Sequence, residues 1–227
     1  MKKKVILVLT LFLGWLASAV PASAWLYVAD YDDSGWQTYY YSAGADGFSG
    51  FAGFVASNAG DTNVYSRLLL DWLSQGPEDN TGFEAGDIGY TLWDSSNWSA
   101  VNGPVTALSD IPYYPTEGDS MSQQWSFGAD TSEFTNAYGM AGTTGSVLEM
   151  PLALEPDEAF FFDWAFLTED EYPFADFSLF YLQDATGKIV FTEGLGQLGP
   201  VPTPEPSTFL LVGIGLALAG IARKKVK

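Results

Sequence analysis

The chain has 227 residues, with 28 acidic against nine basic ones and a formal net charge of −19 at pH 7, and it contains neither Cys nor His. The absence of Cys excludes disulfides, a thiolate nucleophile and Cys-ligated zinc or iron–sulfur sites. The absence of His excludes a Ser-His-Asp triad and any histidine acid–base step. A hydrolase of this composition would have to use carboxylates, as glycosidases do, or a Ser-Lys pair. We therefore expect that the protein is not an enzyme.

The first 24 residues have the pattern of a secretory signal peptide. Three lysines at positions 2–4 precede an apolar segment at 5–16, and Ala22-Ser23-Ala24 forms a cleavage site of small residues. We predict that signal peptidase cleaves between Ala24 and Trp25. An uncleaved anchor is the alternative, and Pro21 beside these small residues argues against it.

Residues 25–198 read as one exported domain of short strands separated by turn-forming residues. The clearest turns are Asp32-Asp33-Ser34-Gly35 and Asp184-Ala185-Thr186-Gly187. The spacing predicts an all-β fold, a β-sandwich or jelly roll. The expected strands are Trp25–Tyr31, Trp36–Ser42, Phe48–Ala56, Ile88–Trp93, Pro104–Leu108, Ser122–Phe127, Ser146–Leu154, Ala159–Leu167, Asp176–Gln183 and Lys188–Thr192.

The segment Asn63–Ser74 has a different pattern. Its apolar residues follow helical spacing, and Gly76-Pro77 would end a helix. We predict one short helix here, packed against the sandwich. The alternative is that Leu68-Leu69-Leu70 lies in a buried strand.

The segment Ser146–Gly194 carries the strongest strand pattern. Aromatic residues recur at every second position, as in a strand with one face in the core between two sheets. The residues expected to be buried are Phe160, Phe162, Trp164, Phe166, Phe177 and Leu179. This aromatic strand, the acidic Tyr-Pro loop after it and the Asp-Phe strand resemble the β-sandwich modules of anchored bacterial surface proteins called choice-of-anchor domains. The resemblance implies a sandwich in a cell-envelope setting.

The acidic loop after Leu167 is the candidate metal site. Hard oxygen donors gathered in a short stretch suit Ca²⁺, although the ligand order of an EF-hand is absent. The residues that would hold Ca²⁺ are Glu169, Asp170, Glu171 and Asp176. The alternative is a solvated acidic loop in which Asp176 caps a turn. A second, weaker cluster consists of Asp30, Asp32 and Asp33.

Several aromatic residues are candidates for stacking on sugar rings. They are Tyr39-Tyr40-Tyr41, Trp93, Trp98, Tyr113-Tyr114 and Trp125. Because consecutive strand residues point to opposite faces, the three tyrosines cannot all lie on one surface. Core packing is the alternative explanation for most of these residues.

The C-terminal end has three parts. A linker at 199–207 contains Pro204-Glu205-Pro206, the apolar segment 208–222 could form a transmembrane helix with flanking residues, and 223–227 form a basic cytoplasmic tail with Arg223, Lys224 and Lys225. This order resembles the PEP-CTERM sorting signal of bacterial envelope proteins. The resemblance implies that an exosortase recognises the triplet and removes the anchor. An ordinary single-pass anchor in the inner membrane is the alternative.

The charge of the exported part limits its partners. Without the two ends, Arg67 and Lys188 are the only basic residues beside 27 acidic ones, a formal charge of −25. Such a surface repels nucleic acids and anionic membranes. It attracts Ca²⁺, Mg²⁺ or cationic partners, unless the acidity only keeps an exported protein soluble.

These patterns predict an exported protein of the cell surface or extracellular matrix with a structural or adhesive role. The first alternative is a carbohydrate-binding module for extracellular polysaccharide. The second is a carboxylate-based glycosidase, which needs two carboxylates flanking a sugar-sized cleft.

Overall fold

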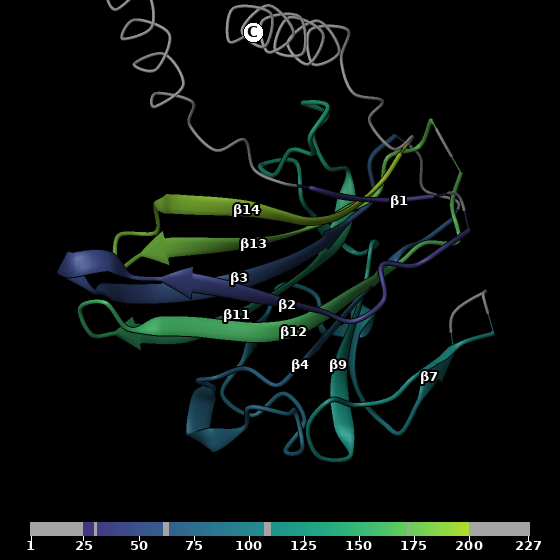
Figure 1. Ribbon diagram of the computed structural model, residues 1–227. Coiled ribbons are helices and arrows are strands. Elements are labelled where there is room, and N and C mark those ends of the chain that lie inside the picture. Colours follow the sequence, from purple (N-terminus) through teal and green to yellow (C-terminus); the bar gives the residue numbers. More distant parts are fainter. Residues whose placement is uncertain (1–24, 30, 61–63, 107–109, 172, 200–227) are drawn as a thin grey trace, which may run out of the picture.

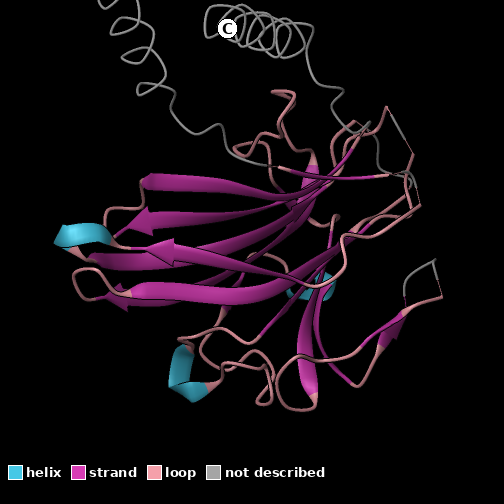
Figure 2. Ribbon diagram, in the orientation of Figure 1, coloured by secondary structure: helices cyan, strands magenta, loops and turns pink. Residues whose placement is uncertain are grey.

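The exported domain is a sandwich of two β-sheets (Figure 1). The computed structural model describes residues 25–29, 31–60, 64–106, 110–171 and 173–199. The predicted signal peptide at 1–24, the Pro204-Glu205-Pro206 signature, the apolar segment 208–222 and the basic tail 223–227 lie outside these residues. Figure 2 shows that strands dominate the described part, as the sequence predicts.

The described residues form fourteen strands and three short 3-10 helices. The strands are β1 (Leu26–Val28), β2 (Gln37–Ser42), β3 (Phe48–Ser57), β4 (Arg67–Asp71), β5 (Thr91–Leu92), β6 (Trp98–Asn102), β7 (Val105–Thr106), β8 (Pro112–Tyr113), β9 (Ser120–Trp125), β10 (Ala129–Asp130), β11 (Thr144–Leu154), β12 (Ala159–Leu167), β13 (Phe177–Asp184) and β14 (Ile189–Leu198). The 3-10 helices are η1 (Gly44–Asp46), η2 (Pro77–Asp79) and η3 (Ser95–Asn97).

The seven-stranded sheet has the order β1-β14-β13-β3-β11-β10, with β5 also paired to β11. The five-stranded sheet has the order β2-β12-β4-β9-β6, and β7 pairs with β8 in a separate ribbon. All pairs in the described part are antiparallel except β1 with β14. The two sheets pack face to face, and residues from both form the main core.

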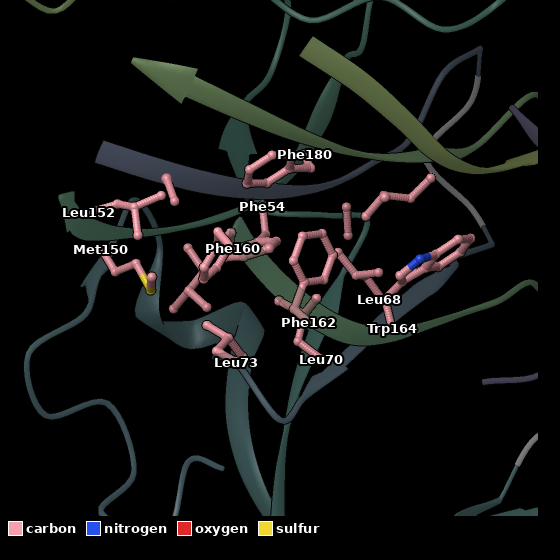
Figure 3. Close-up of a cluster of buried hydrophobic side chains, with 14 of the residues drawn as sticks. Phe54, Leu68, Leu70, Leu73, Met150, Leu152, Phe160, Phe162, Trp164 and Phe180 are labelled. Atoms are coloured by element: carbon pink, nitrogen blue, oxygen red, sulfur yellow. The ribbon is translucent and has the colours of Figure 1, made fainter. Parts of the chain in front are cut away.

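The main core lies between the sheets and is rich in aromatic rings (Figure 3). The ring of Phe162 on β12 lies 4.9 Å from that of Phe54 on β3 and 5.1 Å from that of Phe180 on β13, centroid to centroid. All six residues predicted to be buried are at most 6% exposed. Phe177 and Leu179, however, belong to a second cluster on the outer face of the seven-stranded sheet.

The predicted helix over Asn63–Ser74 is wrong, and the alternative strand is correct. Strand β4 is buried along its whole length, with Leu68 and Leu70 in the main core and Leu69 on the opposite face. Tyr113 of the β7–β8 ribbon packs in the cluster that covers Leu69. A strand buried on both faces has no polar alternation, so its run of leucines imitates the apolar stripe of a helix.

Candidate functional site

The acidic residues of the predicted calcium site each interact with a different partner and do not converge on one point. Glu169 forms an ion pair with Arg67, with Oε1 3.1 Å from the guanidinium nitrogen. The backbone N–H of Glu171 donates to Asp170 at 2.7 Å, and the Tyr31 hydroxyl donates to the Glu171 carboxylate at 3.5 Å. Within the described residues, no three acidic side chains form a group that could hold a metal ion. The calcium prediction therefore receives no support from this geometry.

Asp176, the fourth residue of the predicted set, is a fully buried acceptor. Its Oδ1 accepts a hydrogen bond from the Ala59 N–H at 3.2 Å, and Oδ2 accepts from the Ser66 N–H at 3.1 Å and the Ser126 hydroxyl at 2.9 Å. Burial raises the pKa of Asp176 to about 7, despite the hydrogen bonds from Ser66 and Ser126, and the charge of Asp170 adds to the increase. Asp176 thus holds together three segments, which follow β3, precede β4 and follow β9, and its carboxylate does not face a ligand.

The second acidic cluster is also divided. Asp33 accepts hydrogen bonds from the Gly35 N–H at 3.0 Å and from the Tyr113 hydroxyl. Asp30 lies outside the described residues. Asp33 is therefore part of a turn that contacts Tyr113 of the β7–β8 ribbon, whereas Asp32 is exposed.

The aromatic residues proposed for sugar stacking have different environments. Tyr39 and Tyr41 pack against the main core, whereas Tyr40 between them is 67% exposed, as strand alternation predicts. Trp98 packs against the core. The guanidinium carbon of Arg67 lies over the Trp125 ring, 5.2 Å from the ring centroid. Of these five residues, only Tyr40 presents most of its ring to solvent.

Tyr113 and Tyr114 also separate, with Tyr113 buried at 4% exposure and Tyr114 exposed at 61%. Trp93 is 38% exposed on the outer side of the seven-stranded sheet, where its indole N–H donates to Glu149 at 2.9 Å. The predicted set therefore does not form one platform.

A different set of aromatic rings does meet on the solvent side of the five-stranded sheet. Tyr40 on β2 lies directly opposite Phe161 on β12, with ring centroids 5.6 Å apart. The indole of Trp72 lies 5.3 Å from the Phe161 ring on the same face. We call Tyr40, Phe161 and Trp72 the aromatic patch. In Figure 1, β2 and β12 run side by side across the front of the sandwich.

Trp72 reaches this face because the backbone leaves the strand conformation. It follows Asp71, an outward residue, so strand alternation would direct its indole into the core. Its φ is 45°, a left-handed conformation that is unusual for a bulky residue. The indole is 43% exposed as a result, while the next residue, Leu73, returns to the core.

Polar residues lie beside the aromatic patch on the same face of the five-stranded sheet. The hydroxyl of Thr38, an exposed residue of β2, donates to Oδ1 of Asp163 at 2.6 Å. Because its hydrogen is used in this way, the Thr38 oxygen presents its lone pairs as acceptors. Asp163 lies opposite both Thr38 and Asp71 in the sheet.

Asp71 is buried beneath the segment that contains Thr116 and Glu117. Its Oδ1 accepts from the Trp72 N–H at 2.8 Å, and Oδ2 accepts from the backbone N–H groups of Thr116 at 2.5 Å and Glu117 at 3.0 Å. Burial raises the pKa of Asp71, and these hydrogen bonds counteract the increase. Asp71 therefore holds the Trp72 turn and the covering segment.

Sequence reasoning missed two of the three residues of the aromatic patch. Trp72 is one of the apolar residues whose helical spacing predicts a helix over Asn63–Ser74, and nothing in the sequence signals its left-handed backbone. Phe161 did carry a signal, since it occupies an outward position between the core residues Phe160 and Phe162. An aromatic residue at such a position, opposite an outward Tyr40, indicates an exposed ring cluster.

The C-terminal end agrees with a known sorting signal. Residues 202–225 match the PEP-CTERM protein-sorting motif. The match includes Pro204-Glu205-Pro206, Arg223, Lys224 and Lys225, and it identifies an exported protein with an exosortase signal, whose precursor is anchored in the membrane at this end. Among the described residues, no helix is long and apolar enough to cross a membrane.

No curated protein and no solved structure matches the chain. The resemblance of the segment around residues 160–191 to choice-of-anchor domains is therefore not supported by any relative. The fold agrees with a sandwich, but a fold alone does not specify an activity.

Proposed function

We propose that the exported domain is an adhesive carbohydrate-binding module that attaches to an extracellular polysaccharide through the aromatic patch. The observation that carries this proposal is Trp72, which a left-handed backbone turns out of the strand alternation and onto the solvent face beside Phe161. Such a conformation costs free energy and is found preferentially where function requires it. Exposed aromatic rings offer apolar faces on which sugar rings can stack.

The charge of the domain favours a neutral polysaccharide. Asp163 adjoins the aromatic patch, and the exported part carries a formal charge of −25. An anionic polysaccharide would be repelled at short and long range. Thr38, whose oxygen presents acceptor lone pairs, can instead receive hydrogen bonds from neutral sugar hydroxyls.

The arrangement of the two carboxylates favours binding without hydrolysis. A glycosidase needs two carboxyl groups that both reach the sugar, at a separation of roughly 5 to 10 Å. Asp71 and Asp163 are neighbours, but Asp71 is fully buried and both of its oxygens already accept hydrogen bonds. We therefore propose a binding protein and not an enzyme.

The sorting motif supports a cell-envelope setting for this module. We propose that signal peptidase releases Trp25 as the first residue and that the exosortase then removes the anchor, so that the domain acts at the cell surface or in the extracellular matrix. Mass spectrometry of the released protein tests both steps. A released product that retains Arg223 and the residues after it would contradict anchor removal.

A glycan array tests the polysaccharide itself. The full chain, purified in mild detergent, should bind neutral glycans in preference to uronate-containing or sulfated ones, and it should release no reducing sugar. Trp72→Ala should abolish most of the binding. Trp93→Ala is the matched control, because Trp93 has a similar exposure on the opposite sheet. Equal loss in both variants, or no binding to any glycan, would contradict the proposal.

A further inference from the structure

A pocket of about 270 Å³ opens on the outer face of the seven-stranded sheet, away from the aromatic patch. Trp25 and Phe134 form two aromatic walls, and Leu179 and Ile189 supply apolar surface. Glu133 supplies the acidic side chain, whereas Glu193 lies opposite the core residue Phe180 and directs its side chain to the inner face. No side chain that lines the pocket is basic. Pockets for drug-sized ligands usually measure about 300 Å³ or more, so this one suits a smaller ligand.

The Trp25 wall is held by a specific contact with β14. A Cβ atom at Gly194 would lie 2.1 Å from the indole ring, so only glycine lets the indole lie against the strand. Phe177 also contacts Trp25, edge-on, with 6.0 Å between ring centroids. The wall is therefore built before any ligand arrives.

The Phe134 wall is also fixed, and negative charge lies behind it. Phe134 is 2% exposed and its ring lies 5.1 Å from that of Tyr181. The Tyr181 hydroxyl donates to Glu149 at 2.6 Å, and the Trp93 indole donates to the other oxygen of Glu149 at 2.9 Å. Both oxygens of Glu149 thus accept hydrogen bonds close to the pocket.

The charge of Glu149 acts on Glu133 at the rim of the pocket. Burial raises the pKa of Glu133, and the nearby charges of Glu149 and Asp130 add to the increase. A cation bound beside Glu133 would relieve this repulsion between carboxylates. Indole and phenyl faces attract cations as well, and tryptophan does so most strongly.

We propose that this pocket binds a substituted ammonium group on a small, compact ligand. The positive charge lies between the aromatic walls of Trp25 and Phe134 and faces the carboxylate of Glu133. This site is independent of the polysaccharide proposal, since it lies on the other sheet and uses none of the same residues.

Choline is the probe, and 3,3-dimethyl-1-butanol is its neutral counterpart of the same shape. Each is titrated into the full chain at constant ionic strength, and binding is followed by the indole N–H signal of Trp25 in nuclear magnetic resonance spectra. Choline should shift this signal with saturation, and the alcohol should not. Glu133→Gln should weaken choline binding about fivefold by removing one charge from the rim.

Asp46→Asn is the matched control, because Asp46 is an exposed acid on η1 that does not line the pocket, and it should leave choline binding unchanged. Trp25→Leu should abolish the binding, but Glu133→Gln decides the question if the Trp25 variant folds poorly. Equal shifts with choline and the alcohol would mean that the pocket is only an apolar hollow. Equal weakening by Glu133→Gln and Asp46→Asn would reduce the effect to general charge. Either result overturns the proposal.

Discussion

Asp163 and Asp71 lie directly opposite each other across the β12–β4 ladder, although like charges in such positions repel. The surroundings give them different roles. Asp71 is fully buried and accepts backbone hydrogen bonds from Trp72, Thr116 and Glu117, whereas Asp163 is 7% exposed and accepts from the Thr38 hydroxyl.

The first prediction compares these two carboxylates. Asp71→Asn should lower the free energy of unfolding by about 1–3 kcal/mol, because an amide cannot accept all of the hydrogen bonds that Asp71 accepts. Asp163→Asn keeps an acceptor for the Thr38 hydroxyl and relieves the repulsion between Asp163 and Asp71. The free energy of unfolding of this variant should stay within about 0.5 kcal/mol of that of the wild type. Urea unfolding at pH 7 measures both. Equal losses would show that Asp71 has no special structural role.

The second prediction concerns the pH dependence that Asp176 introduces. Its pKa in the folded protein is about 7, above its ordinary value of 3.8. The folded state therefore holds a proton that the unfolded chain has released, and the contribution of Asp176 to stability is largest below pH 3.8 and is lost as the pH rises through 7. Asp176→Asn should remove this part of the pH dependence and lower stability most at acidic pH.

Asp184→Asn is the control for that experiment. Hydrogen bonds from Thr186 and Lys188 lower the pKa of Asp184, so its contribution is present at neutral pH and is lost on acidification. Urea unfolding curves from pH 4 to pH 8 should therefore show a pH-dependent difference from wild type in Asp176→Asn and a nearly constant difference in Asp184→Asn, whose contribution is lost only below pH 3.8. Parallel curves for wild type and Asp176→Asn would contradict the assignment.

The third prediction concerns calcium. We expect the same melting temperature in excess Ca²⁺ and in chelator, because Glu169 is paired with Arg67 and both oxygens of Asp176 accept hydrogen bonds. The two samples must have the same ionic strength, since screening alone can stabilise so acidic a domain. A higher melting temperature in Ca²⁺ that disappears in Asp176→Asn would restore the calcium hypothesis.

The fourth prediction tests the core. Trp164 on β12 is 6% exposed in the main cluster, so Trp164→Ala should cost about 3–5 kcal/mol of stability. Tyr40→Ala on the solvent face should change stability by less than about 0.5 kcal/mol. Thermal melts followed by circular dichroism separate the two, and a helix-dominated spectrum would contradict the fold itself.

Strand β12 was predictable from the sequence. Its bulky aromatic residues recur at every second position, which indicated its bounds, Ala159–Leu167, and its core residues, although Ala165 and Leu167 on the other face are buried as well. Strand β4 entered only as the alternative to a helix, because burial on both faces removes the alternation. The short strands β6, β8 and β10 were missed, since pairs such as Pro112–Tyr113 depend on tertiary contacts rather than on local pattern.

The candidate site was less predictable than the fold. Tyr40 could be identified as an outward residue from the alternation of three tyrosines, but Trp72 depends on a backbone angle that Asp71 and its neighbours enforce. Asp176 was predicted to be a calcium ligand or a turn cap, and the sequence could not show that Ser66 and Ser126 surround it. Such long-range partners come only from the folded arrangement.

The most direct test of the central claim is affinity electrophoresis of the full chain through gels containing the neutral polysaccharide that the array identifies. Retardation should be strong for the wild type and for Trp93→Ala, and it should be lost in Trp72→Ala and in Phe161→Ala. Retardation that is unchanged in both patch variants, with their folding verified by circular dichroism, would show that the aromatic patch does not bind the polysaccharide.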